Sequence, residues 1–255
     1  MKPLQDDAYV LRTQPLGESD WIVSLLAKEH GLVRGVAKGA RRSRKRFGGL
    51  LQTLNEVNAR WVEKPGRDLH RLEGVEPRAD WTEIQSDPIV HAMCAVLSEV
   101  TEAFSHEAQA ERDIYRLIGA ILQALRDGHS PYLLLRYFEF WMLRLHGLQD
   151  PIDVCGRCHE DLGQSPRLVD HGGLMCRKCH EVDGRPGRPF GRELRRFLLE
   201  LQRSAPNDLT LDVAQARPGG PVESLLRGRL EAFAERRFRT YRHFAQFPVG
   251  EGQPR

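Results

Sequence analysis

Residues 33–46 read Val33-Arg34-Gly35-Val36-Ala37-Lys38-Gly39-Ala40-Arg41-Arg42-Ser43-Arg44-Lys45-Arg46. The stretch begins as a short apolar strand and continues into a loop, with seven lysines and arginines and no acid. Clustered cations bind phosphate backbones because each neutralised phosphate releases condensed counterions. A solvated loop that binds nothing could have the same composition, but the position between two strand-like segments favours a positioned loop. Nucleic acid is therefore the partner that this stretch favours.

Strand-like segments surround the loop on both sides. Short runs rich in β-branched and aromatic residues, separated by glycine and proline, predict strands at 8–13, 21–27, 32–37, 51–62 and 68–75. Five short strands in about 70 residues are typical of a small barrel of the oligonucleotide-binding (OB) type, which carries its ligand on a sheet face and loops. The sequence therefore predicts an OB-type β-barrel over residues 1–80.

Helical spacing replaces the strand pattern in the middle of the chain. Three amphipathic helices are predicted over 82–148. Two of them have a capping residue followed by proline at the first helical position, at Asp87-Pro88 and Ser130-Pro131. Their apolar stripes are interpreted as core, and Cys94 in the first stripe as a small buried apolar side chain.

Two more helices are predicted towards the C-terminus, over 192–203 and 222–246. The second has an apolar stripe beside a basic one, and its six arginines are Arg227, Arg229, Arg236, Arg237, Arg239 and Arg242. The basic stripe is either a second phosphate-contacting surface or a solvated face whose arginine stems cover the core. The sequence leaves both interpretations open.

Four cysteines have the spacing of a metal site. Cys155 and Cys158, then Cys176 and Cys179, form two Cys-x2-Cys pairs separated by 17 residues. This spacing is typical of four thiolates around one tetrahedral zinc ion. Redox-active dithiols and unused thiols are the alternatives, but no thioredoxin-like setting is recognisable. Nearby histidines are interpreted as bystanders (His159, His171 and His180), because four thiolates close the shell and make one Zn²⁺ structural.

The predicted class is therefore a multidomain α+β protein. The OB-type barrel of residues 1–80 precedes a helical domain of residues 81–255. Within the latter we expect a zinc-binding insertion at about 152–182 and a disordered tail at about 248–255.

The charge distribution and the hydropathy of the chain limit the kinds of partner and location that are expected. The formal net charge is +3, distributed as +4 over residues 1–80, −5 over 81–150 and +4 over 151–255. This asymmetry indicates that different parts face different partners. No apolar run approaches the roughly 18 residues of a membrane span, and the N-terminus has no signal-like segment, so a soluble cytoplasmic protein is expected.

No catalytic motif is recognisable. The chain has no Gly-x4-Gly-Lys-Ser/Thr phosphate loop. His159-Glu160 is not followed by a histidine at the metalloprotease spacing. Glu18 and Asp20 could together hold magnesium, although a turn before Trp21 is the favoured interpretation. The chain is therefore expected not to be an enzyme.

Two segments resemble a known family. Residues 18–26, Glu-Ser-Asp-Trp-Ile-Val-Ser-Leu-Leu, and residues 30–43, His-Gly-Leu-Val-Arg-Gly-Val-Ala-Lys-Gly-Ala-Arg-Arg-Ser, resemble the N-terminal signature of the bacterial recombination mediator family RecO. Arg46-Phe47-Gly48-Gly49 continues the likeness. It covers residues 8–245 but is specific only in the first 50 residues and at the cysteines. Some family members lack zinc-site cysteines, so the four present here favour a metal-bound form.

The resemblance implies an OB-fold domain that binds single- and double-stranded DNA and anneals complementary strands. It also implies partnership with RecR, with the acidic C-terminal tail of single-stranded DNA-binding protein (SSB), and indirectly with RecA, at the nucleoid. The binding site for the SSB tail is expected in the helical domain. The matching motif makes Lys38, Arg41 and Arg42 the foremost DNA contacts. Four further contacts are expected on charge and position: Arg34, Arg44, Lys45 and Arg46.

Two other function classes remain open. One is a zinc-containing adaptor whose basic loop docks an acidic protein without touching DNA. The other is a nuclease with an unrecognised carboxylate site.

Overall fold

The computed structural model describes residues 3–43, 46–63, 66, 69–169 and 173–247. The chain forms two compact units, one from Met1–Pro131 with Phe233–Phe247 and the other containing Tyr132–Ala232. The domain boundary expected after residue 80 and the insertion at 152–182 stay predictions, and the tail at 248–255 lies outside the described residues. Within the described ranges, no helix is both long and apolar enough to cross a membrane.

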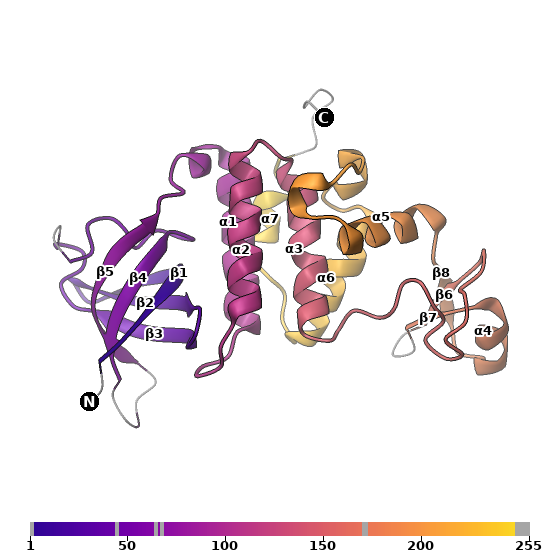
Figure 1. Cartoon of the computed structure of the whole chain (residues 1–255), viewed down its shortest axis with the longest axis horizontal. Coiled ribbons are helices and arrows are strands. Elements are labelled where there is room, and N and C mark those ends of the chain that lie inside the picture. Colours follow the sequence, from indigo (N-terminus) through magenta and orange to yellow (C-terminus); the bar gives the residue numbers. More distant parts are fainter. Residues whose placement is uncertain (1–2, 44–45, 64–65, 67–68, 170–172, 248–255) are drawn as a thin grey trace. The chain divides into compact units, whose positions relative to one another are not determined.

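The first unit contains a closed five-stranded barrel (Figure 1), as predicted. The strands follow the order β1-β2-β3-β5-β4, with β3 and β5 parallel and every other pair antiparallel. Their bounds are β1 Pro3–Leu16, β2 Asp20–Ala27, β3 Gly31–Ala37, β4 Glu56–Val62 and β5 His70–Ala79. The long β1 pairs with β4 through its first half and with β2 through its second half, which closes the barrel.

The fourth strand begins later than the sequence pattern indicates. Residues 51–62 have a continuous strand-like composition, but β4 starts at Glu56. Leu54 has a positive φ of 59° and donates its N–H to the carbonyl of Val10, while Asn55 accepts a bond from the N–H of Val10. The segment therefore turns to meet β1 beside its bulge instead of extending the sheet.

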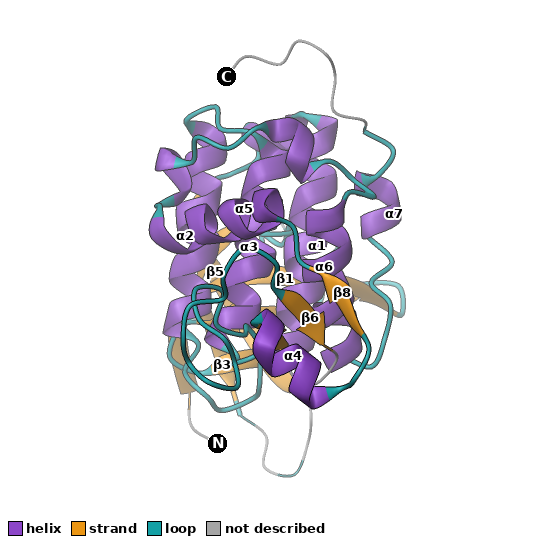
Figure 2. Ribbon diagram, turned by 90° about the vertical axis from the view of Figure 1, so that its right-hand side faces the viewer, coloured by secondary structure: helices purple, strands orange, loops and turns teal. Residues whose placement is uncertain are grey.

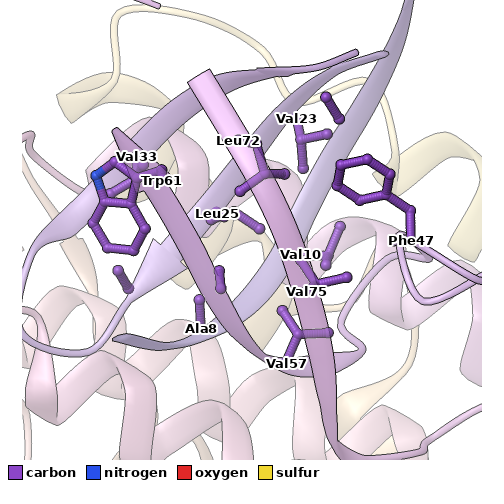
Figure 3. Close-up of a cluster of buried hydrophobic side chains, with 13 residues drawn as sticks. Ala8, Val10, Val23, Leu25, Val33, Phe47, Val57, Trp61, Leu72 and Val75 are labelled. Atoms are coloured by element: carbon purple, nitrogen blue, oxygen red, sulfur yellow. The ribbon is translucent and has the colours of Figure 1, made fainter. Parts of the chain in front are cut away.

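The barrel interior is filled by aliphatic and aromatic side chains (Figure 3). Trp61 on β4 is 1% exposed and Phe47, from the loop between β3 and β4, is 2% exposed. Figure 3 shows these two rings at opposite ends of the cluster. Burying a phenylalanine side chain contributes about 1.5–3 kcal/mol. Phe47 therefore fastens the end of the basic loop to the barrel core.

Two helices of the first unit, α1 (Pro88–Phe104) and α2 (Arg112–Arg126), follow the barrel along the chain. Asp87 caps α1 by accepting the N–H of Ile89, and Pro88 takes the first helical position, as predicted. Cys94 on α1 is 1% exposed, which confirms it as core, and its burial raises the thiol pKa to about 12. Because Ser98 of the same helix donates to the carbonyl of Leu11 on β1, α1 is bonded to the barrel wall.

The segment between α1 and α2 lies on the turn between β2 and β3. Gly31 has a φ of +69°, and a Cβ there would lie 2.3 Å from the carbonyl oxygen of His106 and 2.2 Å from that of Gln109. Only glycine permits both this backbone conformation and this approach. Leu32 donates its N–H to the carbonyl of His106. The barrel and the first two helices are thereby joined into one unit.

The second unit holds the remaining long helices and a small sheet (Figures 1 and 2). Its helices are α3 (Pro131–Leu145), α4 (Arg177–Asp183), α5 (Arg192–Arg203) and α6 (Pro221–Phe233), and its strands are β6 (Arg167–Val169), β7 (Gly173–Met175) and β8 (Gly187–Pro189). The strand order is β7-β6-β8. Short 3-10 turns occur at Pro206–Asp208 and Val213–Ala216 in this unit and at Ile84–Ser86 in the first unit. The helix predicted over 192–203 is confirmed.

The single helix predicted over 222–246 is wrong. α6 ends at Phe233, residues 234–240 are not helical, and a short α7 occupies Tyr241–Phe244. Glu235 has a φ of +50°, and Phe238 is buried at 2% exposure. The carboxylate of Glu99 on α1 accepts the N–H groups of Arg239 and Thr240. A partner 140 residues away therefore replaces the helical hydrogen bonds that the local pattern predicts.

Candidate nucleic-acid interface and metal centre

The basic loop, residues 38–46, forms the first part of the connection between β3 and β4, and the structure describes its residues 38–43 and 46. Two of the predicted contacts, Arg44 and Lys45, lie outside the described residues. Lys38, Arg41, Arg42 and Arg46 are exposed at their places in the loop. The structure thus brings these four predicted cations to one connection of the barrel.

The first half of the loop is fastened to the turn between β1 and β2. The carboxylate of Asp20 accepts the N–H of Gly39 at 2.8 Å and the hydroxyl of Ser19 at 2.9 Å. These bonds lower the pKa of Asp20, so the carboxylate stays ionised at neutral pH. Arg41 donates its N–H to the carbonyl of Ser19 at 3.0 Å. Asp20 therefore orders the loop, in line with the turn interpretation of the Glu18 and Asp20 pair.

The charges of Lys38, Arg41 and Arg42 are not committed to acids. Within the described part of the chain, none of these three side chains forms an ion pair. The guanidinium of Arg41 donates to the carbonyl of Gly17 at 3.3 Å and lies 5.6 Å from the ring centroid of Trp21. The guanidinium of Arg41 is thus held in place, and the charges of all three side chains remain available to a phosphate.

Arg46 and Arg34 form contacts that stabilise the fold. Arg46 donates to the carbonyl of Lys38 at 2.7 Å, and its own carbonyl accepts the N–H of Val75 on β5 at 3.1 Å. Arg34, on β3, lies 3.7 Å from Glu107 as an ion pair. These contacts give both arginines a structural task beside the predicted contact to DNA.

Two apolar side chains near the loop were missed by charge-based reasoning. Trp21 is half-buried at the start of β2, beneath the guanidinium of Arg41, and Leu16 is 41% exposed at the end of β1. Aromatic rings beside cations provide stacking surfaces for bases, each worth about 1–3 kcal/mol. The sequence signal for such a stacking surface is Trp21, which directly follows Asp20 at the start of a predicted strand.

Two substitutions of Asp20 separate the effect of loop order on DNA binding from the effect of the Asp20 charge. Asp20→Asn removes the negative charge but keeps an oxygen that can accept the N–H of Gly39, so we expect DNA affinity to rise slightly through reduced repulsion. Asp20→Ala removes the same charge and also the acceptor, so the loop loses its anchor. We expect D20A to bind single-stranded DNA more weakly than D20N in a fluorescence titration. Equal affinities would show that the Asp20 bond does not position the loop.

The four cysteines lie together in the second unit and can hold one metal ion. Their sulfur atoms all lie within 4.8 Å of one another, and those of Cys158 and Cys176 are 3.9 Å apart. Zn–S bonds of about 2.3 Å in a tetrahedron place sulfurs about 3.8 Å apart. Among the described residues, these cysteines are the only cluster of three or more His, Cys, Asp or Glu side chains with this property. The donor set and the spacing both fit zinc.

Local structure positions each cysteine pair. Cys176 directly precedes α4, where its sulfur accepts the N–H of Cys179 at 3.5 Å, and its own N–H lies 3.3 Å from the sulfur of Cys155. In this small sheet, β7 directly precedes α4 along the chain and β8 follows it (Figure 1). The first pair lies on a turn, where the N–H of Gly156 bonds to the carbonyl of Leu174 on β7. The two halves of the site are thus joined by backbone bonds.

The sulfurs differ in acidity. Burial opposes ionisation of Cys155, but N–H groups of Cys158, Cys176 and Arg157 outweigh it and lower its pKa to about 6. A hydrogen bond that the Cys179 thiol donates to Cys158, together with burial, raises the pKa of Cys179 to about 12. The fold therefore favours a thiolate first at Cys155, and thiolates are the form that binds metal.

The nearby histidines do not join the cysteine cluster. His159 is exposed and has a φ of +60°. The ring of His180 lies against Gly187, where a Cβ would approach its Nε2 to 2.6 Å. His171 lies outside the described residues. For His159 and His180, this agrees with the bystander interpretation.

Comparisons with known proteins match both halves of the chain. A family model described as "Recombination protein O N terminal" matches residues 1–80, and one described as "Recombination protein O C terminal" matches residues 85–217. The chain belongs to the RecO family. The resemblance of the N-terminal signature is therefore confirmed, and the OB-type barrel is the N-terminal fold of RecO.

Curated RecO relatives agree over about two thirds of the chain. A "DNA repair protein RecO" from Anaeromyxobacter sp. (strain K) is 35% identical over 172 residues, which cover 67% of this chain and 68% of the relative. A protein of the same name from Koribacter versatilis (strain Ellin345) is 33% identical over 175 residues, which cover 68% and 70%. The one from Streptomyces griseus subsp. griseus is 32% identical over 186 residues, covering 70% and 75%. These likenesses place the chain in a family of DNA repair proteins.

Proposed function

We propose that this RecO-family chain binds single- and double-stranded DNA without sequence preference and anneals complementary strands. The observation that carries the proposal is the basic loop, in which Lys38, Arg41 and Arg42 are exposed, ordered by Asp20 and without ion pairs among the described residues. Contacts to phosphates carry no sequence information, so such binding accepts unrelated sequences.

Annealing by such a surface requires no fuel. Two DNA strands repel each other through their phosphates, and cationic side chains reduce this repulsion by displacing counterions. Base pairing then supplies the driving free energy. The chain's own contribution is to hold strands through their backbones while the base edges stay free to pair.

The same proposal includes the partners that the family likeness implies. With RecR, the chain helps load RecA onto DNA that is coated by SSB, and it binds the acidic C-terminal tail of SSB; these tasks place it at the nucleoid. The metal at Cys155, Cys158, Cys176 and Cys179 is one structural Zn²⁺, because four thiolates leave no coordination position for water or substrate.

The test is a titration of labelled DNA with the full chain. Single- and double-stranded oligonucleotides of unrelated sequences should bind with similar affinity within each type, and the logarithm of the affinity should fall linearly with the logarithm of the salt concentration. Complementary strands should pair faster in the presence of the protein. Absence of DNA binding, with binding of an acidic protein instead, would favour the adaptor. Cleavage in the presence of Mg²⁺ would favour the nuclease.

A further inference from the structure

A pocket of about 480 Å³ opens in the first unit beside the non-helical segment 236–240. Four arginines line it: Arg12 from β1, and Arg236, Arg237 and Arg239 from the segment. Its floor is partly apolar, with Leu11 and Ala95 among the lining side chains. Pockets of about 300–1,000 Å³ are typical of ligand sites. This pocket uses none of the residues of the basic loop or the cysteine cluster.

The three arginines of segment 236–240 are held on a fixed turn. The carboxylate of Glu99 accepts the N–H of Arg239 at 3.2 Å, the N–H of Thr240 at 2.9 Å and the hydroxyl of Thr240 at 2.6 Å. Phe238 is buried in the middle of the segment at 2% exposure. Arginines on a solvated helix face would have neither restraint. Ordering them in advance lowers the entropy cost of binding a ligand.

The two acids of the pocket are already used by the fold. Glu99 binds the turn, and although its burial opposes ionisation, the bonds from Thr240 and Arg239 and the charge of Arg236 lower its pKa. Glu102 accepts the hydroxyl of Ser24 at 2.7 Å and lies 3.7 Å from Arg12. Four arginines thus face two carboxylates. The pocket keeps an excess of positive charge.

Arg237 and Arg239 carry this excess. Both side chains are exposed, and within the described ranges neither forms an ion pair. Arg236 is partly engaged, because it donates to the carbonyl of Glu99 at 3.5 Å and lies 5.4 Å from the ring centroid of Phe238. Guanidinium groups bind phosphate oxygens in a bidentate manner. The ligand that suits this pocket is therefore anionic.

The position of the pocket along β1 favours a nucleic acid. Arg12 pairs with Ser24 in the hairpin of β1 and β2, and Leu16 pairs with Asp20 at the end of the same hairpin, where the basic loop is fastened. Four residues of strand separate Arg12 from Leu16, or about 13 Å. A few nucleotides of a single strand span this distance, which is within the roughly 4–16 nucleotides that one OB fold binds.

We infer that the pocket lined by Arg12, Arg237 and Arg239 binds phosphates of a single-stranded nucleic acid whose neighbouring nucleotides contact the basic loop. The inference rests on the proposed function, since it extends the backbone contacts of the loop along the hairpin. An acidic peptide would meet the same arginines but has no need of the second cationic cluster on the same hairpin.

The test compares the unmodified chain with Arg237→Ala/Arg239→Ala, using labelled oligo-deoxythymidine long enough to reach both sites. Loss of two phosphate contacts should make the slope of log affinity against log salt shallower by about 1.4, from about 0.7 per contact on single strands. Arg237→Lys/Arg239→Lys keeps the charge and should restore most of the slope, provided that both variants melt like the unmodified chain. Arg116→Ala/Arg196→Ala removes the same charge from exposed positions elsewhere and should leave the slope nearly unchanged.

The outcomes separate this inference from the proposed function. If the unmodified chain binds no DNA, both fail. If it binds DNA, and R237A/R239A has the slope of R116A/R196A, the pocket inference alone is overturned. If R237A/R239A binds DNA normally but no longer binds a labelled peptide rich in aspartate, the pocket is a peptide site and the inference is wrong.

Discussion

Replacement of Cys176 by serine is expected to abolish metal binding and to unfold the segment between Cys155 and His180. Apparent zinc-binding free energies of zinc-finger peptides are on the order of 10 kcal/mol at neutral pH. The short strands β6 and β7 have three residues each, and α4 has only seven. Elements of this length do not form without an external constraint, because isolated helices shorter than about 12 residues are marginal in water.

Cys176→Ser is informative because serine retains the capping function. The sulfur of Cys176 accepts the N–H of Cys179 at the start of α4, and serine is among the preferred residues at such a position. Loss of structure in C176S is therefore attributable to the metal and not to the helix cap.

The measurements are the zinc content by mass spectrometry and hydrogen exchange across 155–180. The unmodified chain should hold about one zinc, as four thiolates form one tetrahedral shell, and C176S should hold none and exchange rapidly in this segment. Cys94→Ser is the matched control, because Cys94 lies in the core of α1 and outside the cysteine cluster. It should keep the zinc. Full protection of the segment in a metal-free C176S protein would contradict the structural role.

The features that the sequence predicts correctly all depend on residues that lie close together along the chain. The Cys-x2-Cys pairs determine their geometry within one turn each, so their spacing sufficed to predict a cluster that the structure brings within 4.8 Å. The cap at Asp87-Pro88 likewise depends on adjacent residues. The barrel strands likewise follow from a local signal, namely short runs of β-branched and aromatic residues separated by glycine and proline.

The features that were missed depend on distant partners. Segment 234–240 has helical composition, but Glu99 binds its N–H groups and Phe238 enters the core. Periodicity within 222–246 contains no information about either contact. The late start of β4 has a similar cause, since Leu54 bonds to Val10. Local patterns predict elements well where no distant polar group competes for their backbone bonds.

At the candidate DNA interface, too, local sequence predicts some features, and others depend on distant partners. Charge predicts the cations of the basic loop, because a run without acids is visible in the sequence, and the family motif places Lys38, Arg41 and Arg42 first among them. Neither signal indicates which cations the fold itself uses. Arg46 bonds to the carbonyl of Lys38, and Arg34 pairs with Glu107, whereas Lys38, Arg41 and Arg42 keep their charges available. The structure thus gives a physical reason to test these three first.

Simultaneous replacement of Lys38, Arg41 and Arg42 by alanine is expected to weaken DNA binding about equally for unrelated sequences. If all three contact phosphates, the slope of log affinity against log salt should become shallower by about 2, from about 0.7 per contact on single strands. Annealing should slow in parallel, because it depends on holding both strands. The fold should persist, since exposed charges contribute only about 0–1 kcal/mol each to stability.

Arg116→Ala/Arg196→Ala/Arg203→Ala is the control for this triple variant, because it removes three exposed cations outside the loop. Fluorescence titrations at several salt concentrations should leave the control close to the unmodified chain. Unchanged DNA affinity in K38A/R41A/R42A, with lost binding of an acidic protein, would favour the adaptor. Unchanged affinity for both would instead assign the main DNA contact to the arginines of segment 236–240. Because the loop variant and R237A/R239A remove separate contacts, their slope changes should add when the substitutions are combined.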